Sequence, residues 1–117
     1  MINPYSEDER LQVMLTCCFS AVKSGFQHLA MRDIIDPPHE WFDAALARQI
    51  VIHLFHSQFD VPKRRIHEMM NRRRGSIAAA IYTVDNRLEC AVFAKAYNRM
   101  AGRANDLFMR EIQKAAA

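Results

Sequence analysis

The sequence has few of the residues that break regular structure and none of the cross-linking patterns that hold small domains together. Its 117 residues include three glycines and four prolines, too few for a disordered or collagen-like chain. The three cysteines follow no spacing typical of disulfides or metal sites, so we expect a reducing compartment. No apolar run approaches the roughly 20 residues that span a bilayer, and no cationic leader opens the sequence. We therefore expect a cytoplasmic protein with no membrane partner.

Signatures of enzymes are also missing from the sequence. It has no glycine-rich phosphate loop, no paired set of carboxylates and no Ser–His or Cys–His arrangement. His53 and His56 could reach one metal ion from a helix, but no third ligand follows at a recognisable interval. We therefore expect neither enzymatic activity nor a metal or cofactor. Cys17 and Cys18 are expected to be core thiols, since a buried free cysteine behaves as a small apolar residue.

What the sequence does contain is the composition of one folded domain and an uneven distribution of charge. Half of the residues are apolar and a quarter are charged, and the length suffices for a single core. Residues 1–60 carry four basic and eight acidic side chains, whereas residues 61–117 carry twelve basic and five acidic ones. A basic surface on one part of a protein favours a polyanionic partner.

Apolar residues recur at helical spacing, and the sequence predicts an all-α bundle of four to six helices in a single domain. Ser6 and Glu9 form a capping box at the start of an N-terminal helix expected over residues 6–32. Gly25 is expected to weaken this helix without ending it. Asp36 precedes two prolines and should end it, because the residue before a proline disfavours helical geometry.

A central helix is expected from residue 38 or 40 to about residue 58, with an apolar surface wide enough for the middle of a bundle. A C-terminal helical extension over residues 89–116 fits either one long helix or two. Its Phe93, Tyr97 and Met100 need a covering surface, which either the N-terminal helix or a partner subunit would supply. The second alternative is a homodimer through the N- and C-terminal helices.

Residues 61–88 hold a basic stretch between two expected helices. The first has Asp60 as its expected N-cap and Pro62 in its first turn. Three consecutive arginines, flanked by Asn71 and Gly75, form the expected turn. The second helix places apolar residues on one side at three- and four-residue spacing, namely Ile77, Ala80, Ile81, Val84 and Leu88. Its other side is small, polar or cationic, which suits insertion into a DNA major groove.

Short motifs in this region resemble domain IV of the bacterial replication initiator DnaA, a Trp-repressor-like helix-turn-helix. Ala47-Arg48-Gln49-Ile50 resembles the start of the family's central helix, Asp60-Val61-Pro62 its Ser-Leu-Pro motif, and Ile66 its helix isoleucine. Arg72 matches the arginine of the family's Gly-Arg-Asp-His-Thr-Thr-Val signature, and Ser76-Ile77 match the final Thr-Val once one loop residue is deleted. The resemblance implies a helix-turn-helix core over about residues 44–88.

The sequence departs from that family where the family reads bases. Arg73 and Arg74 stand in place of Asp-His, and Gly75 stands in place of the first Thr. The segment ahead of the central helix, residues 36–40, is acidic where the family has a basic loop for the minor groove. The resemblance therefore implies the fold, without recognition of the family's own box sequence.

Six cations lie within the twelve residues from Lys63 to Arg74, with Glu68 as the only acid among them. Cations at the start of a helix are unfavourable beside the helix dipole, and a bound phosphate would relieve that repulsion. We expect the cations to face outward together as one ridge that contacts phosphates, with Arg73 or Arg74 pairing with guanine. The expected DNA-binding residues are Lys63, Arg64, Arg65, Arg72, Arg73, Arg74, Ser76, Ala79, Thr83 and Arg87. The sequence thus predicts a sequence-specific duplex DNA-binding protein, a bacterial or phage transcriptional regulator.

Two other functions fit the same pattern. A protein–protein adaptor of a replication or transcription complex would keep the helix-turn-helix shape and use its basic face against an acidic protein. RNA binding is less favoured, because the basic stretch lacks the interleaved aromatic residues that stack on unpaired bases.

Overall fold

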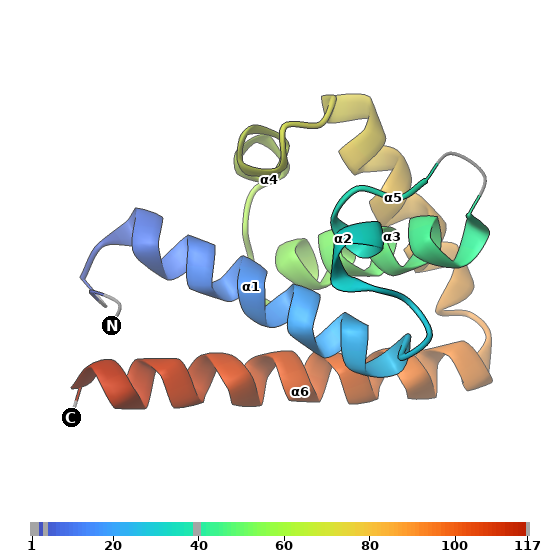
Figure 1. The fold of residues 1–117 in the computed structure, drawn as a ribbon. Helices are drawn as coiled ribbons and strands as arrows, with labels where there is room; N and C mark the ends of the chain where they lie inside the picture. Colours follow the sequence, from blue (N-terminus) through green and yellow to red (C-terminus); the bar gives the residue numbers. More distant parts are fainter. Residues whose placement is uncertain (1–2, 4, 39–40, 117) are drawn as a thin grey trace.

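The described chain is built entirely from helices and their connections. The computed structural model describes residues 3, 5–38 and 41–116. In that part of the chain it has six helices and no strand, which confirms the predicted all-α fold (Figure 1). The helices are α1 (Glu7–Gly25), α2 (Met31–Ile35), α3 (Phe42–Ser57), α4 (Lys63–Met70), α5 (Arg74–Arg87) and α6 (Ala91–Ala116).

α1 begins where the sequence predicts but ends earlier. The Glu9 amide donates to the Ser6 hydroxyl at 3.4 Å, which is the predicted cap. The helix stops at Gly25, so the prediction of one helix over residues 6–32 is wrong. Glycine is a weak helix former. A β-carbon on Gly25 would also lie 2.9 Å from the sulfur of Met100 in α6, so its absence lets the two helices approach closely.

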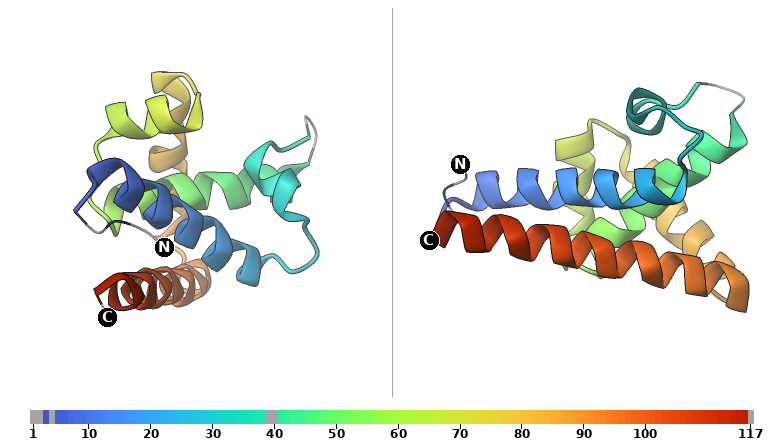
Figure 2. Two further views of the ribbon diagram at one scale, coloured as in Figure 1. Left: turned by 60° about the vertical axis from the view of Figure 1, so that its left-hand side comes forward. Right: turned by 60° about the horizontal axis from the view of Figure 1, so that its bottom comes forward.

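α3 is the central helix, as predicted, and packs against α1, α2, α4 and α5 (Figure 2). It begins at Phe42, later than the predicted residue 38 or 40, of which residue 40 lies outside the described chain. Its buried residues cover most of its circumference and are Ala44, Ala47, Arg48, Ile50, Val51, Ile52, His53, Leu54 and Phe55. A helix buried on so many sides holds the neighbouring helices in place.

α6 is one continuous helix and runs alongside α1 (Figures 1 and 2). Tyr97 and Met100 are buried and Phe93 is half-buried against the same core. The surface that covers these side chains is therefore supplied by the same chain, and a partner subunit is not needed for that purpose. Although α6 has 26 residues, none of the described helices is apolar enough over a sufficient length to cross a membrane.

A buried polar contact joins three of the helices. His53 of α3 exposes 3% of its surface. Its Nδ1 lies 2.6 Å from the hydroxyl of Tyr97 in α6, and its Nε2 lies 2.6 Å from a carboxylate oxygen of Asp85 in α5. A neutral ring that donates from Nε2 to the carboxylate accepts the tyrosine hydroxyl at Nδ1, so both ring nitrogens are satisfied. Burial raises the pKa of Tyr97 to about 12, which keeps the hydroxyl protonated as a donor.

Candidate nucleic-acid interface

The first helix of the predicted helix-turn-helix, α4, begins differently from the prediction. Its N-cap is Pro62, whereas Asp60 has a left-handed backbone with φ 57°. The predicted Asp60 cap is therefore wrong, because this residue turns the chain out of α3 instead. The amide of Val61 then donates to the carbonyl of Phe55 at 3.3 Å. The start of α4 has neither a side-chain cap nor an acidic residue in its first turn, which leaves its first amides suited to an anion.

The turn between α4 and α5 is shorter than predicted. Asn71 ends α4 in the left-handed region, with φ 53° and ψ 47°, a conformation that asparagine tolerates at helix ends. The Nδ1 of His67 donates to the carbonyl of Arg72 at 2.5 Å and fixes the bend. Arg73 is the N-cap of α5, and Arg74 is already its first helical residue. The prediction that all three arginines lie in the turn is therefore wrong for Arg74.

α5 has the two different sides that the sequence predicts. Its inward side packs on α3 and α4, with Ile77, Ala80, Ile81 and Val84 buried and Leu88 half-buried. On the other side, Ser76 and Ala79 are exposed and Thr83 is half-buried. The guanidinium carbon of Arg87 lies 5.3 Å from the centre of the Phe42 ring, a cation–π contact that ties this arginine to the start of α3.

Three of the six predicted phosphate-binding cations are paired with carboxylates of the protein itself. Arg64 lies 3.4 Å from Glu68, one turn along α4. Arg65 pairs with Asp8 at the start of α1, and Arg72 pairs with Asp36 at 3.0 Å. The other three, Lys63, Arg73 and Arg74, are exposed and make no ion pair with the described residues.

The prediction of one outward cationic ridge is therefore wrong for the three paired arginines. Asp8 at the start of α1 reaches Arg65 of α4, and Asp36, which follows α2, reaches Arg72 in the turn. Acidic side chains from the first half of the chain thus pair with the basic second half. The carboxylates of these pairs remain 51%, 82% and 85% exposed for Glu68, Asp8 and Asp36. Exposed ion pairs contribute only about 0–1 kcal/mol, so a phosphate can replace these carboxylates at low cost.

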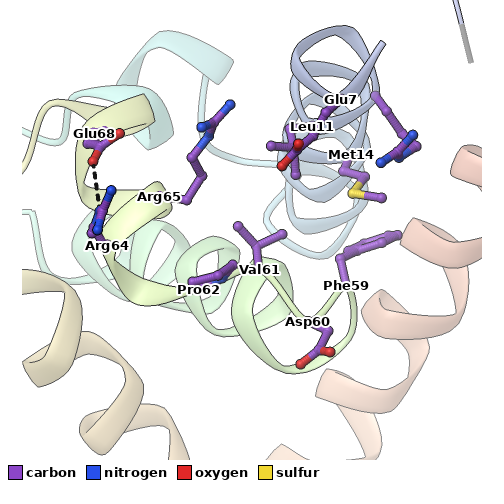
Figure 3. Close-up of a pocket in the computed structure, with 11 residues that line it drawn as sticks. Glu7, Leu11, Met14, Phe59, Asp60, Val61, Pro62, Arg64, Arg65 and Glu68 are labelled. Atoms are coloured by element: carbon purple, nitrogen blue, oxygen red, sulfur yellow. Dashed lines mark hydrogen bonds and ion pairs between the residues drawn. The ribbon is translucent and has the colours of Figure 1, made fainter. Parts of the chain in front are cut away.

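Figure 3 shows that Arg64 and Arg65 point to different sides of α4. Arg64 reaches back to Glu68, whereas Arg65 extends toward α1. Between α1 and α4 lies a cavity of about 460 Å³, with an apolar floor formed by Leu11, Met14, Phe59 and Val61. Its rim carries charges of both signs, so it has no excess of one charge that would select a polyanion.

Arg48 is a functional candidate that the sequence alone did not single out. It is almost fully buried in α3, and its Nη1 atom has no hydrogen-bond partner among the described residues. Burial, and then the nearby charge of Arg72, lower the pKa of Arg48 to about 10. In the sequence, Arg48 stands out only by its place in the Ala-Arg-Gln-Ile motif. Helical periodicity puts it beside the apolar stripe of the central helix but does not show that its side chain is buried.

His53, His56, Cys17 and Cys18 have structural roles in the described chain. His53 bonds Tyr97 and Asp85, and the Nδ1 of His56 donates to the carbonyl of Val61 at 2.8 Å. No group of three metal-ligating side chains occurs among the described residues. The predicted core positions of the two adjacent cysteines are confirmed, since Cys17 and Cys18 are both buried.

No protein-family model, curated protein or solved structure matches this chain. The resemblance to DnaA domain IV therefore stays a prediction from short motifs. The features that bear on function are the geometry of α4, α5 and the cations around them.

Proposed function

We propose that this chain is a sequence-specific double-stranded DNA-binding protein, a transcriptional regulator of bacterial or phage type, with α4, the turn and α5 as its helix-turn-helix. The observation that carries the proposal is the two-sided character of α5. One side is buried against α3 and α4, while the exposed side begins with Arg73 and Arg74 and continues with the short side chains of Ser76 and Ala79. Short side chains let a helix approach base edges closely in the major groove.

Each part of this unit has a distinct role in the proposal. The first residues of a recognition helix contact base edges in helix-turn-helix proteins, and Arg73 and Arg74 occupy that position in α5. A bidentate arginine–guanine pair contributes about 1–3 kcal/mol of discrimination against another base. Ser76 and Ala79 follow within the next two turns and would contact the next bases, Ala79 through an apolar contact such as that with a thymine methyl group.

The remaining cations would bind the DNA backbone. Lys63 is exposed at the start of α4, where the helix dipole also favours a phosphate. Arg64 and Arg65 follow it and would exchange their exposed carboxylate partners for phosphates. These contacts carry no sequence information and position the recognition helix on the duplex. Two copies joined through α1 and α6 would present two such units to two half-sites.

The test begins with selection of binding sites from a random duplex pool, followed by affinity measurements on the selected site. The double variant Arg73→Ala, Arg74→Ala should bind at least about 30-fold more weakly, from two lost base contacts. Its matched control is Arg103→Ala, Arg110→Ala, which removes the same charge from exposed positions of α6. The proposal fails if the pool yields no preferred sequence, or if the control loses as much affinity as the double variant.

The alternative is a protein–protein adaptor of a replication or transcription complex. Tyr97 and Met100 do not favour it, because both are buried within the chain. The feature that does favour it is a set of exposed aromatic side chains, with Trp41 51%, Phe42 64% and Tyr82 68% exposed. An adaptor would elute early from heparin at moderate salt, whereas the proposed DNA-binding protein should be retained.

A further inference from the structure

A second positively charged site lies where the start of α5 meets α3. Arg48 exposes 9% of its surface, and its Nη1 atom is buried without a hydrogen-bond partner among the described residues. Buried polar groups are normally hydrogen-bonded, and an unpaired buried donor is costly. Arg48 therefore has donor capacity at this position that the described part of the protein does not use.

Among the described residues, the surroundings of Arg48 carry more positive than negative charge. Burial is the main cause of the lowered pKa of Arg48, and the nearby charge of Arg72 is the second cause. At a pKa of about 10 the guanidinium group of Arg48 is still charged at neutral pH. Asp36 has the opposite effect and accepts a hydrogen bond from Arg72 at 3.0 Å. In the described part of the chain, two guanidinium groups thus share one carboxylate, and a second anion would balance the cluster.

A cavity of about 430 Å³ opens beside the two guanidinium groups. Its polar lining includes Gln49 and Ser76, and its apolar lining is formed by Pro37, Pro38, Ala45, Ile52, Ala79 and Ala80. The first turn of α5 reaches the same cavity through Ser76. That turn has no side-chain cap and no acidic residue, and a β-carbon placed on Gly75 would meet nothing within 4 Å. The amide of Ser76 already donates to the carbonyl of Arg73 at 3.0 Å, whereas the amides of Arg74 and Gly75 make no hydrogen bond among the described residues. These two unused helix N–H groups are available to an anion.

We propose that Arg48, Arg72, Ser76 and the first amides of α5 bind one tetrahedral oxyanion of phosphate type. The two guanidinium groups neutralise its charge, and the serine hydroxyl and helix amides donate to its oxygens. Two sources share this chemistry. One is a backbone phosphate of the duplex, in which case Ser76 contacts the backbone and Ala79 alone contacts a base beyond the two arginines. The other is a free phosphomonoester whose organic group would pack against the prolines and Ile52. The site itself does not depend on the proposed DNA binding.

The direct test is titration of ¹⁵N-labelled protein with inorganic phosphate, against chloride at equal ionic strength. Saturable shifts are expected at the Arg74 and Gly75 amides. Arg48→Met should weaken phosphate binding at least about tenfold, the effect of losing a charge-assisted contact, whereas Arg103→Met on α6 should leave it unchanged. Asp36→Asn should strengthen binding, because it removes the carboxylate that competes for Arg72.

Folding of the key variant can be checked separately. Methionine fills much of the same space, and replacing a buried charge that has no carboxylate of its own removes the cost of keeping that charge out of water. Arg48→Met should therefore have an unchanged or higher Tm in chloride, and its Tm should respond less to phosphate than that of the wild type. A lower Tm in chloride would show that Arg48 already has its counterion within the protein and would overturn the proposal.

Two further titrations distinguish the sources. Methyl phosphate tests a free ester, and a short selected duplex tests the backbone. Displacement of inorganic phosphate by the duplex assigns the site to the DNA, and simultaneous binding assigns it to a free ligand; both outcomes uphold the site. No saturable shift in the wild type, or equal shifts in Arg48→Met, would overturn it. Phosphate binding by a protein that fails to bind DNA would overturn the proposed function and leave this site standing.

Discussion

The proposed DNA interface competes with carboxylates of the protein itself, and removal of those carboxylates is its most informative perturbation. Asp8 pairs with Arg65, and Glu68 pairs with Arg64. If both arginines contact phosphates, DNA binding has to break both pairs. The double variant Asp8→Asn, Glu68→Gln removes this cost without touching any DNA-contacting residue. We therefore expect it to bind duplex DNA more tightly than the wild type.

The size of the gain follows from the exposure of the pairs. Both carboxylates are more than half exposed, and ion pairs of this kind contribute about 0.2–1 kcal/mol each. Two such pairs amount to about 0.4–2 kcal/mol. Since about 1.4 kcal/mol corresponds to a tenfold change in affinity, the double variant should bind about 2- to 30-fold more tightly.

The assay is fluorescence anisotropy of a labelled duplex at several salt concentrations. The matched control is Asp106→Asn, Glu111→Gln, which makes the same change in net charge on α6 and also breaks an exposed pair, Glu111 with Lys114. In Figure 1 α6 lies on the opposite side of α3 from α4, and among the described residues neither Asp106 nor Glu111 forms an ion pair with a cation of α4 or the turn. Equal gains in the two variants, or no gain at Asp8 and Glu68, would refute the phosphate contacts.

Two further predictions concern the core and the thiols. Tyr97→Phe leaves Nδ1 of buried His53 without its hydrogen-bond partner, which should lower the free energy of unfolding by about 1–3 kcal/mol. Urea denaturation measures this change. An unchanged midpoint would show that the 2.6 Å contact between Tyr97 and His53 does not stabilise the fold. Cys90 should be the first cysteine that iodoacetamide alkylates, because backbone N–H groups at the start of α6 lower the pKa of its exposed thiol, whereas burial raises that of Cys18. Mass spectrometry identifies the modified residue, and equal labelling of both cysteines would contradict the prediction.

Local sequence patterns predicted the parts of the fold that depend on near neighbours. The Ser6 side-chain cap and the apolar stripe of α5 are both present, because a cap and a helical stripe involve residues three or four positions apart. The other half of the predicted capping box is absent, since the Glu9 carboxylate accepts from the amide of Asn3 and not from that of Ser6. The errors at Asp60 and Gly25 concern helix ends, where several backbone conformations suit the same residue types. Asp60 has the residue type of a cap, but its left-handed φ of 57° gives it a turn instead.

The charge arrangement could not be predicted, because it depends on contacts between distant residues. Arg65 and Asp8 are 57 positions apart, and Arg72 and Asp36 are 36 positions apart. No sequence periodicity connects such distant residues. The basic stretch was therefore predicted to be free of ion pairs with the rest of the chain. Arg48 was missed because a charged residue next to an apolar stripe has the same sequence pattern whether it lies at the surface or, as here, beneath α5.

The folded arrangement changes what the uneven charge of the sequence means for DNA binding. The acidic first half places carboxylates on Arg65 and Arg72, so the surface around the turn is less cationic than residues 61–117 suggest. Displacing these carboxylates costs the same on any duplex, whereas the contacts of Arg73 and Arg74 with bases form only on a matching one. Under the proposed function, the internal ion pairs therefore reduce the affinity for any duplex more than they reduce discrimination between matching and non-matching duplexes. Arg73 and Arg74 at the start of α5 then contribute a larger share of the binding free energy than they would if Arg65 and Arg72 were unpaired.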